Sequence, residues 1–267
     1  STTTEVNAVA DAVYSGMGAY LTIHALNLIG KGSFSFPVTL LPLIGGLAGM
    51  LCGVILGYVS TKRAGTTFAM ISMGIGEMVA ACSLMFPGFF GGEAGISGNR
   101  MVGKGWFGIS YGPSIEVFYL IAAWMMLAII AMYALTHTPL GRMMNAVRDN
   151  PERAEFVGYN PQRVRYLAMI LAGFFAGVAG GLSAINYEIV TAEAVGAIRS
   201  GNVLVMAFIG GMGQFFGPIL GAVLMVSLGM TLSGITKAWL FYFGILFLSM
   251  VLFAPGVAPP CPPVVAP

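Results

Sequence analysis

The charged residues that could do chemistry are scarce in this sequence and gather in one polar segment, residues 139–166. The segment carries five arginines and three carboxylates, at Arg142, Arg148, Arg153, Arg163, Arg165, Asp149, Glu152 and Glu155. The sequence shows no nucleophile beside a general base, no phosphate-binding loop of the form G-x-x-x-x-G-K-[ST] and no set of His and Cys at metal-ligand spacing. We therefore expect no catalytic residue, no metal site and no cofactor in this chain.

The polar segment has the signals of a short helix that is capped at both ends. Asn150 is a good N-cap residue, and Pro151 suits the first helical position. Glu152 and Glu155 follow, near the positive end of the helix dipole, and Gly158 is a natural stop. The pattern predicts a helix of about two turns over residues 151–157.

Two interpretations of this helix stay open, a solvated connector and a docking element for a partner. Its charged side chains could pair with a partner surface, and Phe156 could fill a groove. Asn160 and Pro161 repeat the cap-plus-proline signal, so a second helix begins directly afterwards. The candidate docking residues are Asn150, Pro151, Glu152, Arg153, Ala154, Glu155, Phe156 and Gly158.

The composition indicates a membrane protein. Hydrophobic residues make up 57% of the 267 residues and charged residues 8%, against about 25% charged in soluble domains. So few charges could not cover the surface of a soluble fold. A net charge of +2 gives no indication of a nucleic-acid partner.

We predict an all-α fold, a polytopic transmembrane helical bundle of about seven membrane segments, because apolar stretches of about 20 residues recur along the chain. The stretches cover residues 12–29, 35–60, 67–86, 115–136, 166–189, 202–233 and 238–253. Residues 12–254 form the transmembrane domain, with a polar loop at 137–165. Residues 1–11 are polar and unlike a span, and we interpret them as an altered or truncated N-terminal segment. The Pro-rich tail 255–267 is expected to be disordered.

Glycines recur every four residues on three of these stretches, which allows close helix packing. The three sets are Gly49, Gly53 and Gly57; Gly173, Gly177 and Gly181; and Gly213, Gly217 and Gly221. The third set lies in GGMGQFFGPILG, which we predict to be a broken or re-entrant helix. Its glycines Gly210, Gly211, Gly213 and Gly217 either pack or leave backbone bare toward a translocation path.

Glu77 is the one carboxylate well inside a predicted span. An ionised carboxylate in hydrocarbon costs several kcal/mol, so the side chain should face a polar cavity or a partner. An inter-helix hydrogen bond, a place on a translocation path and a place in a subunit interface all remain open.

The basic residues favour one orientation in the membrane. Short loops rich in Lys and Arg stay in the cytoplasm. The expected inner residues are Lys62, Arg63, Arg142, Arg148, Arg153, Arg163 and Arg165, and the outer ones are Lys31, Arg100, Lys104, Arg199 and Lys237.

The polar segment also resembles a known family. Glu152-Arg153-Ala154 followed after three residues by Gly158 is similar to the E-A-A-x-x-x-G cytoplasmic motif of ABC-importer permeases, with Arg153 in place of the usual Ala at the second position and no downstream Leu-Pro. The longer stretch GRMMNAVRDNPERAEFVGYNPQRVRYLAMILAGFFAGVAGGL resembles the branched-chain amino acid ABC transporter permease family. The motif TFAMISMGIGEMV, which contains Glu77, resembles that family too.

The resemblance implies a permease subunit in the cytoplasmic (inner) membrane of a prokaryote, with residues 151–157 as its coupling helix. The implied partners are a second homologous permease, two cytoplasmic ATPase subunits that bind ATP and Mg, and an external solute-binding protein. The implied cargo is branched-chain amino acids. A permease for urea or short amides is an alternative within the family, and an autonomous channel or secondary carrier is an alternative outside it.

Overall fold

The structure is a computed structural model, and it describes residues 2–32, 36–62, 66–102, 111–211, 215–235, 241–242 and 244–245. The chain divides into two compact units, Ser1–Ser200 and Gly201–Pro267. In chain order the elements are α1 (Thr2–Gly30), η1 (Val38–Leu40), α2 (Leu41–Ser60), α3 (Thr66–Met85), α4 (Pro87–Phe90), η2 (Gly92–Ala94), β1 (Ile96–Ser97), η3 (Arg100–Val102), α5 (Ser114–His137), α6 (Pro139–Asp149), α7 (Pro151–Phe156), α8 (Pro161–Tyr187), β2 (Ile189–Val190), η5 (Ala192–Val195), α9 (Ala197–Gly210) and α10 (Gly217–Ile235). The described part of the chain is an all-α helical bundle with one small two-stranded sheet, as the sequence predicts for the fold class.

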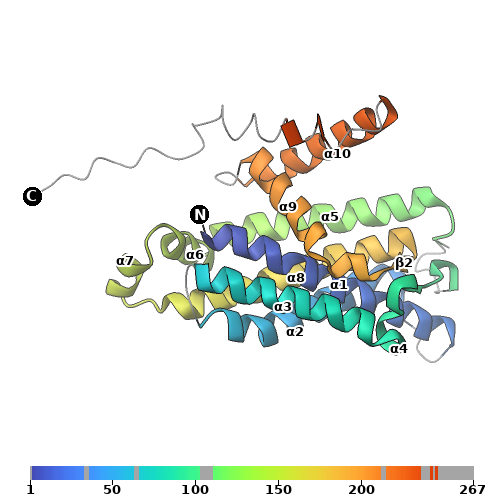
Figure 1. The fold of residues 1–267 in the computed structure, drawn as a ribbon, viewed down its shortest axis with the longest axis horizontal. Helices are drawn as coiled ribbons and strands as arrows, with labels where there is room; N and C mark the ends of the chain where they lie inside the picture. Colours follow the sequence, from blue (N-terminus) through green and yellow to red (C-terminus); the bar gives the residue numbers. More distant parts are fainter. Residues whose placement is uncertain are drawn as a thin grey trace, which may run out of the picture. The chain divides into compact units, whose positions relative to one another are not determined.

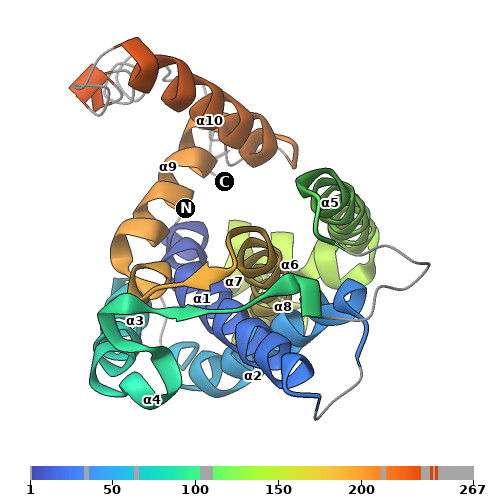
Figure 2. The ribbon, with the colours of Figure 1, turned by 90° about the vertical axis from the view of Figure 1, so that its right-hand side faces the viewer.

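The core of the first unit is built from α1, α2 and α8. Figure 2 looks along these helices and shows them together, with α3 on one side and α5 on the other. The glycines predicted to pack do so. A Cβ atom added at Gly173 of α8 would lie 2.6 Å from the carbonyl oxygen of Gly49 in α2. One added at Gly45 would lie 2.7 Å from the carbonyl oxygen of Gly177. We call this contact the glycine seam.

Helix α1 packs against the glycine seam through Gly18, near the middle of α1. A Cβ atom at Gly18 would lie 2.6 Å from the carbonyl oxygen of Gly177 and 2.9 Å from that of Gly45. Three backbones therefore meet at one place, where only glycine leaves enough room. Tyr20 and Ile23, on the next turn of α1, are fully buried.

The two ends of the first unit carry different structures, which Figure 1 shows at opposite ends of the bundle. Helices α6 and α7 lie at one end. At the other end β1 pairs with β2 in antiparallel register, Ile96 opposite Val190. Arg100 holds this second end together: its guanidinium ion-pairs with Glu188 at 3.6 Å and donates hydrogen bonds to the carbonyl oxygens of Tyr111, Gly112, Ile185 and Asn186. We call this the Arg100 clamp.

In the second unit the predicted break is confirmed. Helix α9 ends at Gly210, Gly211 has φ +88°, and α10 begins at Gly217. A Cβ atom added at Gly210 would lie 2.9 Å from the amide nitrogen of Gly221, so the ends of α9 and α10 pack backbone against backbone. Gly213 lies outside the described residues.

Four helices in the described part of the chain are long and apolar enough to cross a membrane: Val38–Ser60, Ser114–His137, Pro161–Tyr187 and Gly217–Gly234. A fifth crossing is formed if Met70–Met85 and Pro87–Ala94, which bend by 88°, make one broken span. The sequence predicted about seven segments. Helix α1 is not among the four, since it carries polar side chains such as His24 and Asn27. The predicted span 238–253 lies largely outside the described residues.

Three local features differ from the sequence prediction. The bend after α3 was not predicted, although Pro87 at the start of α4 removes an amide donor there. Helix α1 begins at Thr2, so it includes polar residues that the sequence set apart from the spans. The start of the polar loop is itself a helix, α6, because Thr138 caps it through a hydrogen bond from the Gly141 amide at 3.4 Å.

The glycine seam makes a first prediction. Gly177→Val should destabilise the protein by about 2 kcal/mol or more, since the added atoms overlap the backbone of α2 and no flexible side chain can move away. Thermal unfolding of the detergent-purified protein measures this. Gly234→Ala is the matched control, because a Cβ there has open space. An equal melting temperature for the two variants would contradict the role given to the seam.

Candidate functional site

The short helix α7 is capped at both ends, as the sequence predicts. The side-chain oxygen of Asn150 accepts a hydrogen bond from the Arg153 amide at 3.1 Å, and Pro151 occupies the first turn. Gly158 has φ +92°, and its amide donates to the Glu155 carbonyl at 2.9 Å. The Tyr159 amide donates to the Ala154 carbonyl at 3.0 Å. These bonds satisfy the end of the helix in the way a left-handed glycine cap does.

A small apolar cluster fixes α7 to its neighbours. Ala154 is 5% exposed and packs with Val147 of α6 and Val164 of α8. Met143 and Met144 of α6 cover the cluster. Asn160 then caps α8, since its side chain accepts hydrogen bonds from the amides of Gln162 and Arg163. Helix α7 is therefore attached to α8 through both packing and a short, capped turn.

The outer face of α7 exposes two large apolar side chains to solvent. Phe156 is 89% exposed and Val157 is 74% exposed. Glu152, Arg153 and Glu155 are exposed around them. An aromatic side chain this exposed, ringed by charges, has the composition of a protein–protein anchor. We call these five residues the α7 face.

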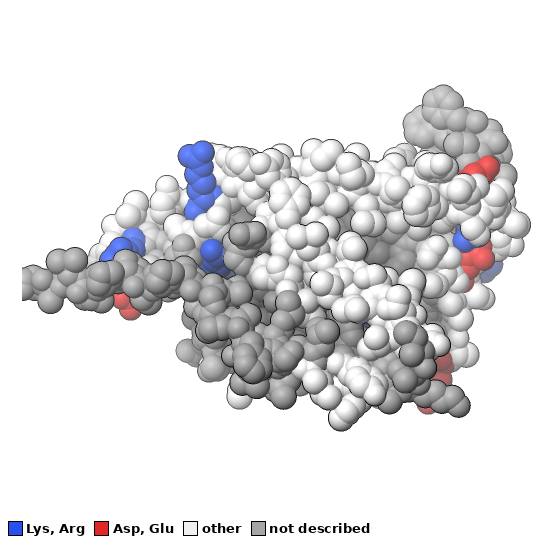
Figure 3. All heavy atoms as spheres, turned by 90° about the horizontal axis from the view of Figure 1, so that it is seen from above, with Lys and Arg blue, Asp and Glu red and all other residues white. Residues whose placement is uncertain are grey.

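The charges of the first unit separate toward its two ends. Figure 3 shows the coloured side chains near the ends, with an almost uncharged face between them. Because α2 and α8 run antiparallel, Lys62 lies at the α7 end, with Arg142, Arg148, Arg153, Arg163 and Arg165. Lys31 and Arg100 lie at the other end. Arg63, Lys104 and Lys237 lie outside the described residues.

Glu77 lies on the exposed side of α3. The buried side of this helix carries Phe68, Ser72 and Ser83. Among the bonds that the structure gives for its described residues, none ties Glu77 to another helix, so the sequence alternative of an inter-helix hydrogen bond within this chain gains no support. Glu77 and the α7 face belong to different parts of the first unit.

The glycines named for a translocation path have two different settings. Gly210 and Gly217 contact each other's backbone, which is a packing arrangement. Gly211 has open space around it. That this backbone faces a path stays a prediction.

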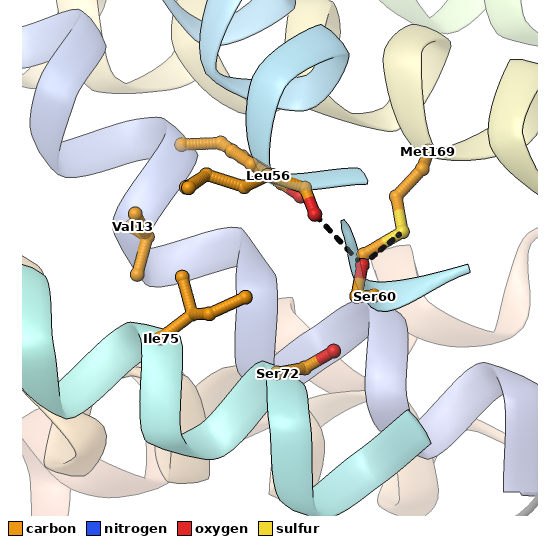
Figure 4. Close-up of a pocket in the computed structure, with 7 residues that line it drawn as sticks. Val13, Leu56, Ser60, Ser72, Ile75 and Met169 are labelled. Carbon is orange, nitrogen blue, oxygen red and sulfur yellow. Dashed lines mark hydrogen bonds between the residues drawn. The ribbon is translucent and has the colours of Figure 1, made fainter. Parts of the chain in front are cut away.

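A small cavity, which the sequence gave no signal for, lies between α1, α2, α3 and α8 (Figure 4). Val13, Leu56, Ile75 and Met169 line it, with two serines. The hydroxyl of Ser60 donates to the Leu56 carbonyl at 3.1 Å and contacts the Met169 sulfur at 3.7 Å. The cavity has room for about one water molecule, so it is too small for an organic cargo. In the part of the chain that the structure describes, no group of three or more His, Cys, Asp or Glu could hold a metal.

Residues 9–255 match the model of a family described as the permease component of branched-chain amino acid transport systems. The chain belongs to this family. It is therefore a multi-pass membrane protein of the ABC-importer permease kind, and the resemblance seen in the polar segment is confirmed.

Individual relatives are also transport permeases, for branched-chain amino acids and for a sugar. The chain is 30% identical over 234 residues to the high-affinity branched-chain amino acid transport system permease protein LivM of Escherichia coli (strain K12), covering 80% of this chain and 54% of that protein. It is 26% identical to the fructose import permease protein FrcC of Rhizobium meliloti, covering 84% of this chain and 64% of that protein.

A third relative is the probable branched-chain amino acid transport permease protein LivH of Methanocaldococcus jannaschii, 27% identical, covering 82% of this chain and 69% of that protein. The chain spans about half the length of the LivM proteins it matches. No solved structure matches the chain.

The sequence named Phe156 but missed Val157 as an exposed apolar residue, and it missed the cluster that holds α7. Met143 and Val147, four residues apart in the polar segment, were the available signal, since this spacing places both on one helix face. The Arg100 clamp joins residues too distant in sequence for any such signal.

The separation of charges makes a second prediction, on sidedness. In a chain whose native cysteines are replaced, Glu155→Cys and Glu93→Cys should react with a membrane-impermeant thiol reagent from opposite sides of the membrane. Both positions are exposed, one on α7 and one in η2 at the other end, whereas Ala154 is buried and would label poorly. Labelling of intact cells and of inverted vesicles measures the two sides. Reaction of both cysteines from the same side would refute this topology.

Proposed function

We propose that this chain is the transmembrane permease subunit of an ATP-driven importer that moves branched-chain amino acids across the cytoplasmic membrane of a prokaryote. It works with a second homologous permease, two cytoplasmic ATPase subunits and an external solute-binding protein. ATP and Mg are bound by the ATPase subunits. The family membership and the names of the LivM and LivH relatives support this proposal.

The observation that carries the proposal is the α7 face. ATP hydrolysed in another subunit can drive this chain only through a mechanical contact. Helix α7 can move as a rigid body, because it is capped at both ends and packed through Ala154. Phe156 stands out from it and is free to enter a groove on the ATPase. The basic residues around it also agree with a cytoplasmic location.

Two alternatives make different experimental predictions. A permease for urea or short amides would assemble with the same kind of partners but carry other cargo. An autonomous channel or secondary carrier would transport without an ATPase. Uptake by the assembled importer in proteoliposomes, with ATP and a panel of leucine, isoleucine, valine, urea and short amides, separates the three. Uptake that needs no ATPase subunit would overturn the proposal.

The α7 face makes a third prediction. Phe156→Ala should weaken binding of the ATPase subunit by about thirtyfold or more, because truncating a central aromatic anchor costs about 2 kcal/mol or more at an interface. Pull-down of the ATPase and cargo-stimulated ATP hydrolysis in the assembled complex measure the effect. The chain itself should remain in the membrane, since Phe156 supports no packing within the first unit. Leu127→Ala is the matched control, on the exposed side of α5.

The cap of the same helix gives a fourth prediction. Gly158→Val should act through the backbone, since a β-branched residue at φ +92° costs about 1–3 kcal/mol. The strain should shift or fray the end of α7 and uncouple hydrolysis from uptake. The space beside Gly158 is open, so a steric clash would not explain the loss. Normal ATPase docking and coupling in both variants would leave α7 as a simple connector.

A further inference from the structure

Helix α3 has an exposed stripe with a single carboxylate at its centre. The stripe consists of Met70, Met73, Gly74, Glu77, Met78 and Ala81, all exposed. The opposite side of α3 packs into the first unit through Phe68 and Ser72. The stripe is thus the side of α3 that this unit leaves uncovered.

Glu77 lies near the middle of α3, which crosses the membrane if α3 and α4 form the fifth, broken span. At about 1.5 Å per residue, Glu77 lies about 16 Å from the Thr66 end of α3 and about 12 Å from the Met85 end. Both distances are close to half the thickness of the hydrocarbon layer. A carboxylate at this depth faces a water-filled path or a partner, since lipid contact is costly.

The described part of the first unit offers no cation at that depth. No Lys or Arg occurs within α2, α3 or α5, and the two arginines of α8 lie in its first turns, at Arg163 and Arg165. A positive group for Glu77 would therefore have to come from outside the described part of the first unit.

The shape beside Glu77 suits a small ligand. Gly74, one turn away on the same side, has nothing within 4 Å of a Cβ built on it. Ala81, one turn further on, is also small. Met70 and Met73 lie exposed on the same side of α3, and flexible thioether chains fit aliphatic groups of varying shape.

We propose that the α3 stripe binds the cargo as it crosses the membrane, with Glu77 accepting hydrogen bonds from the α-ammonium group of an aliphatic amino acid and the methionines covering its side chain. This inference rests on the proposed function and specifies its cargo site. The stripe contains no Asn, Gln or aromatic residue of the kind that lines sugar sites, so its chemistry favours an amino acid over a sugar.

The first test uses the assembled importer in proteoliposomes. At leucine concentrations below saturation, Glu77→Gln should lower the rate of leucine uptake by about tenfold or more, since it removes the charge from a charge-assisted hydrogen bond. Glu77→Asp should retain part of the uptake. ATPase docking should be unchanged in both variants, because Glu77 lies far along the chain from the α7 face. Full leucine uptake by Glu77→Gln would overturn the inference.

The second test measures whether cargo protects the proposed site from a thiol reagent. In a chain without native cysteines, Gly74→Cys should react with a trimethylammonium thiosulfonate reagent, and leucine should slow the reaction during transport. The deaminated analogue 4-methylpentanoate should not slow it, because it lacks the ammonium group. Protection by leucine should disappear when Glu77→Gln is added. Leu127→Cys on α5 is the control position and should show no protection.

The outcomes separate the two levels of the proposal. An importer that takes up no amino acid at all refutes the proposed function. An importer with normal leucine uptake in Glu77→Gln, together with ready disulfide cross-linking of Gly74→Cys between two chains, shows that the stripe is a subunit contact and refutes the cargo site alone. Equal protection by leucine and 4-methylpentanoate also refutes it.

Discussion

The glycine seam between α2 and α8 is the contact on which the rest of the first unit depends. Inside a bilayer, apolar side chains gain nothing by leaving lipid for protein, so helices associate through close packing. Gly49, Gly173 and Gly177 let the two backbones approach directly, and Gly18 brings α1 to the same place. Larger residues at these positions would hold the helices apart. The antiparallel pair thereby determines which loops lie at which end.

Helix α8 links those two ends. It begins at Asn160, directly after α7, and it finishes beside Glu188, where the Arg100 clamp closes the other end. Because α8 packs against α2 in the glycine seam, α7 is joined directly to a helix of the core. Helix α5 differs, since it is mostly exposed and contacts the core near its start, through Val117, Leu120 and Trp124.

The uncovered surfaces agree with a subunit of a larger assembly. The α7 face, the α3 stripe and much of α5 all expose large apolar side chains in the described part of the chain. Lipid can cover α5, whose exposed residues include Phe118 and Leu127 and no charge beyond its first turn. Lipid would cover the α3 stripe poorly, because a carboxylate at Glu77 is costly in hydrocarbon. The α7 face lies before the start of α8 and includes charged residues. Membership of the permease family supplies a reason for such surfaces.

The sequence by itself determined the features that depend on composition or on neighbours along the chain. The scarcity of charge decided the membrane class. The ends of α7 followed from Asn150, Pro151 and Gly158, because helix caps are made by hydrogen bonds that reach only a few residues. The break after Gly210 was predicted from the run of glycines and from Pro218, which lacks an amide donor, and these signals are local too. The spacing of the glycines also indicated which helix faces pack.

Tertiary structure decided what depends on residues far apart. Spacing did not reveal that Gly49 faces Gly173, because a glycine face fits many partners. The burial of Ala154 and the exposure of Phe156 depend on how α6 and α8 flank α7. The Arg100 clamp joins residues 88 apart, and strands of two residues are too short to show a pattern. Glu77 stood out in the sequence as a carboxylate in the middle of an apolar stretch. Only the packing of α3 against its neighbours showed that the side chain lies on the exposed side of the helix.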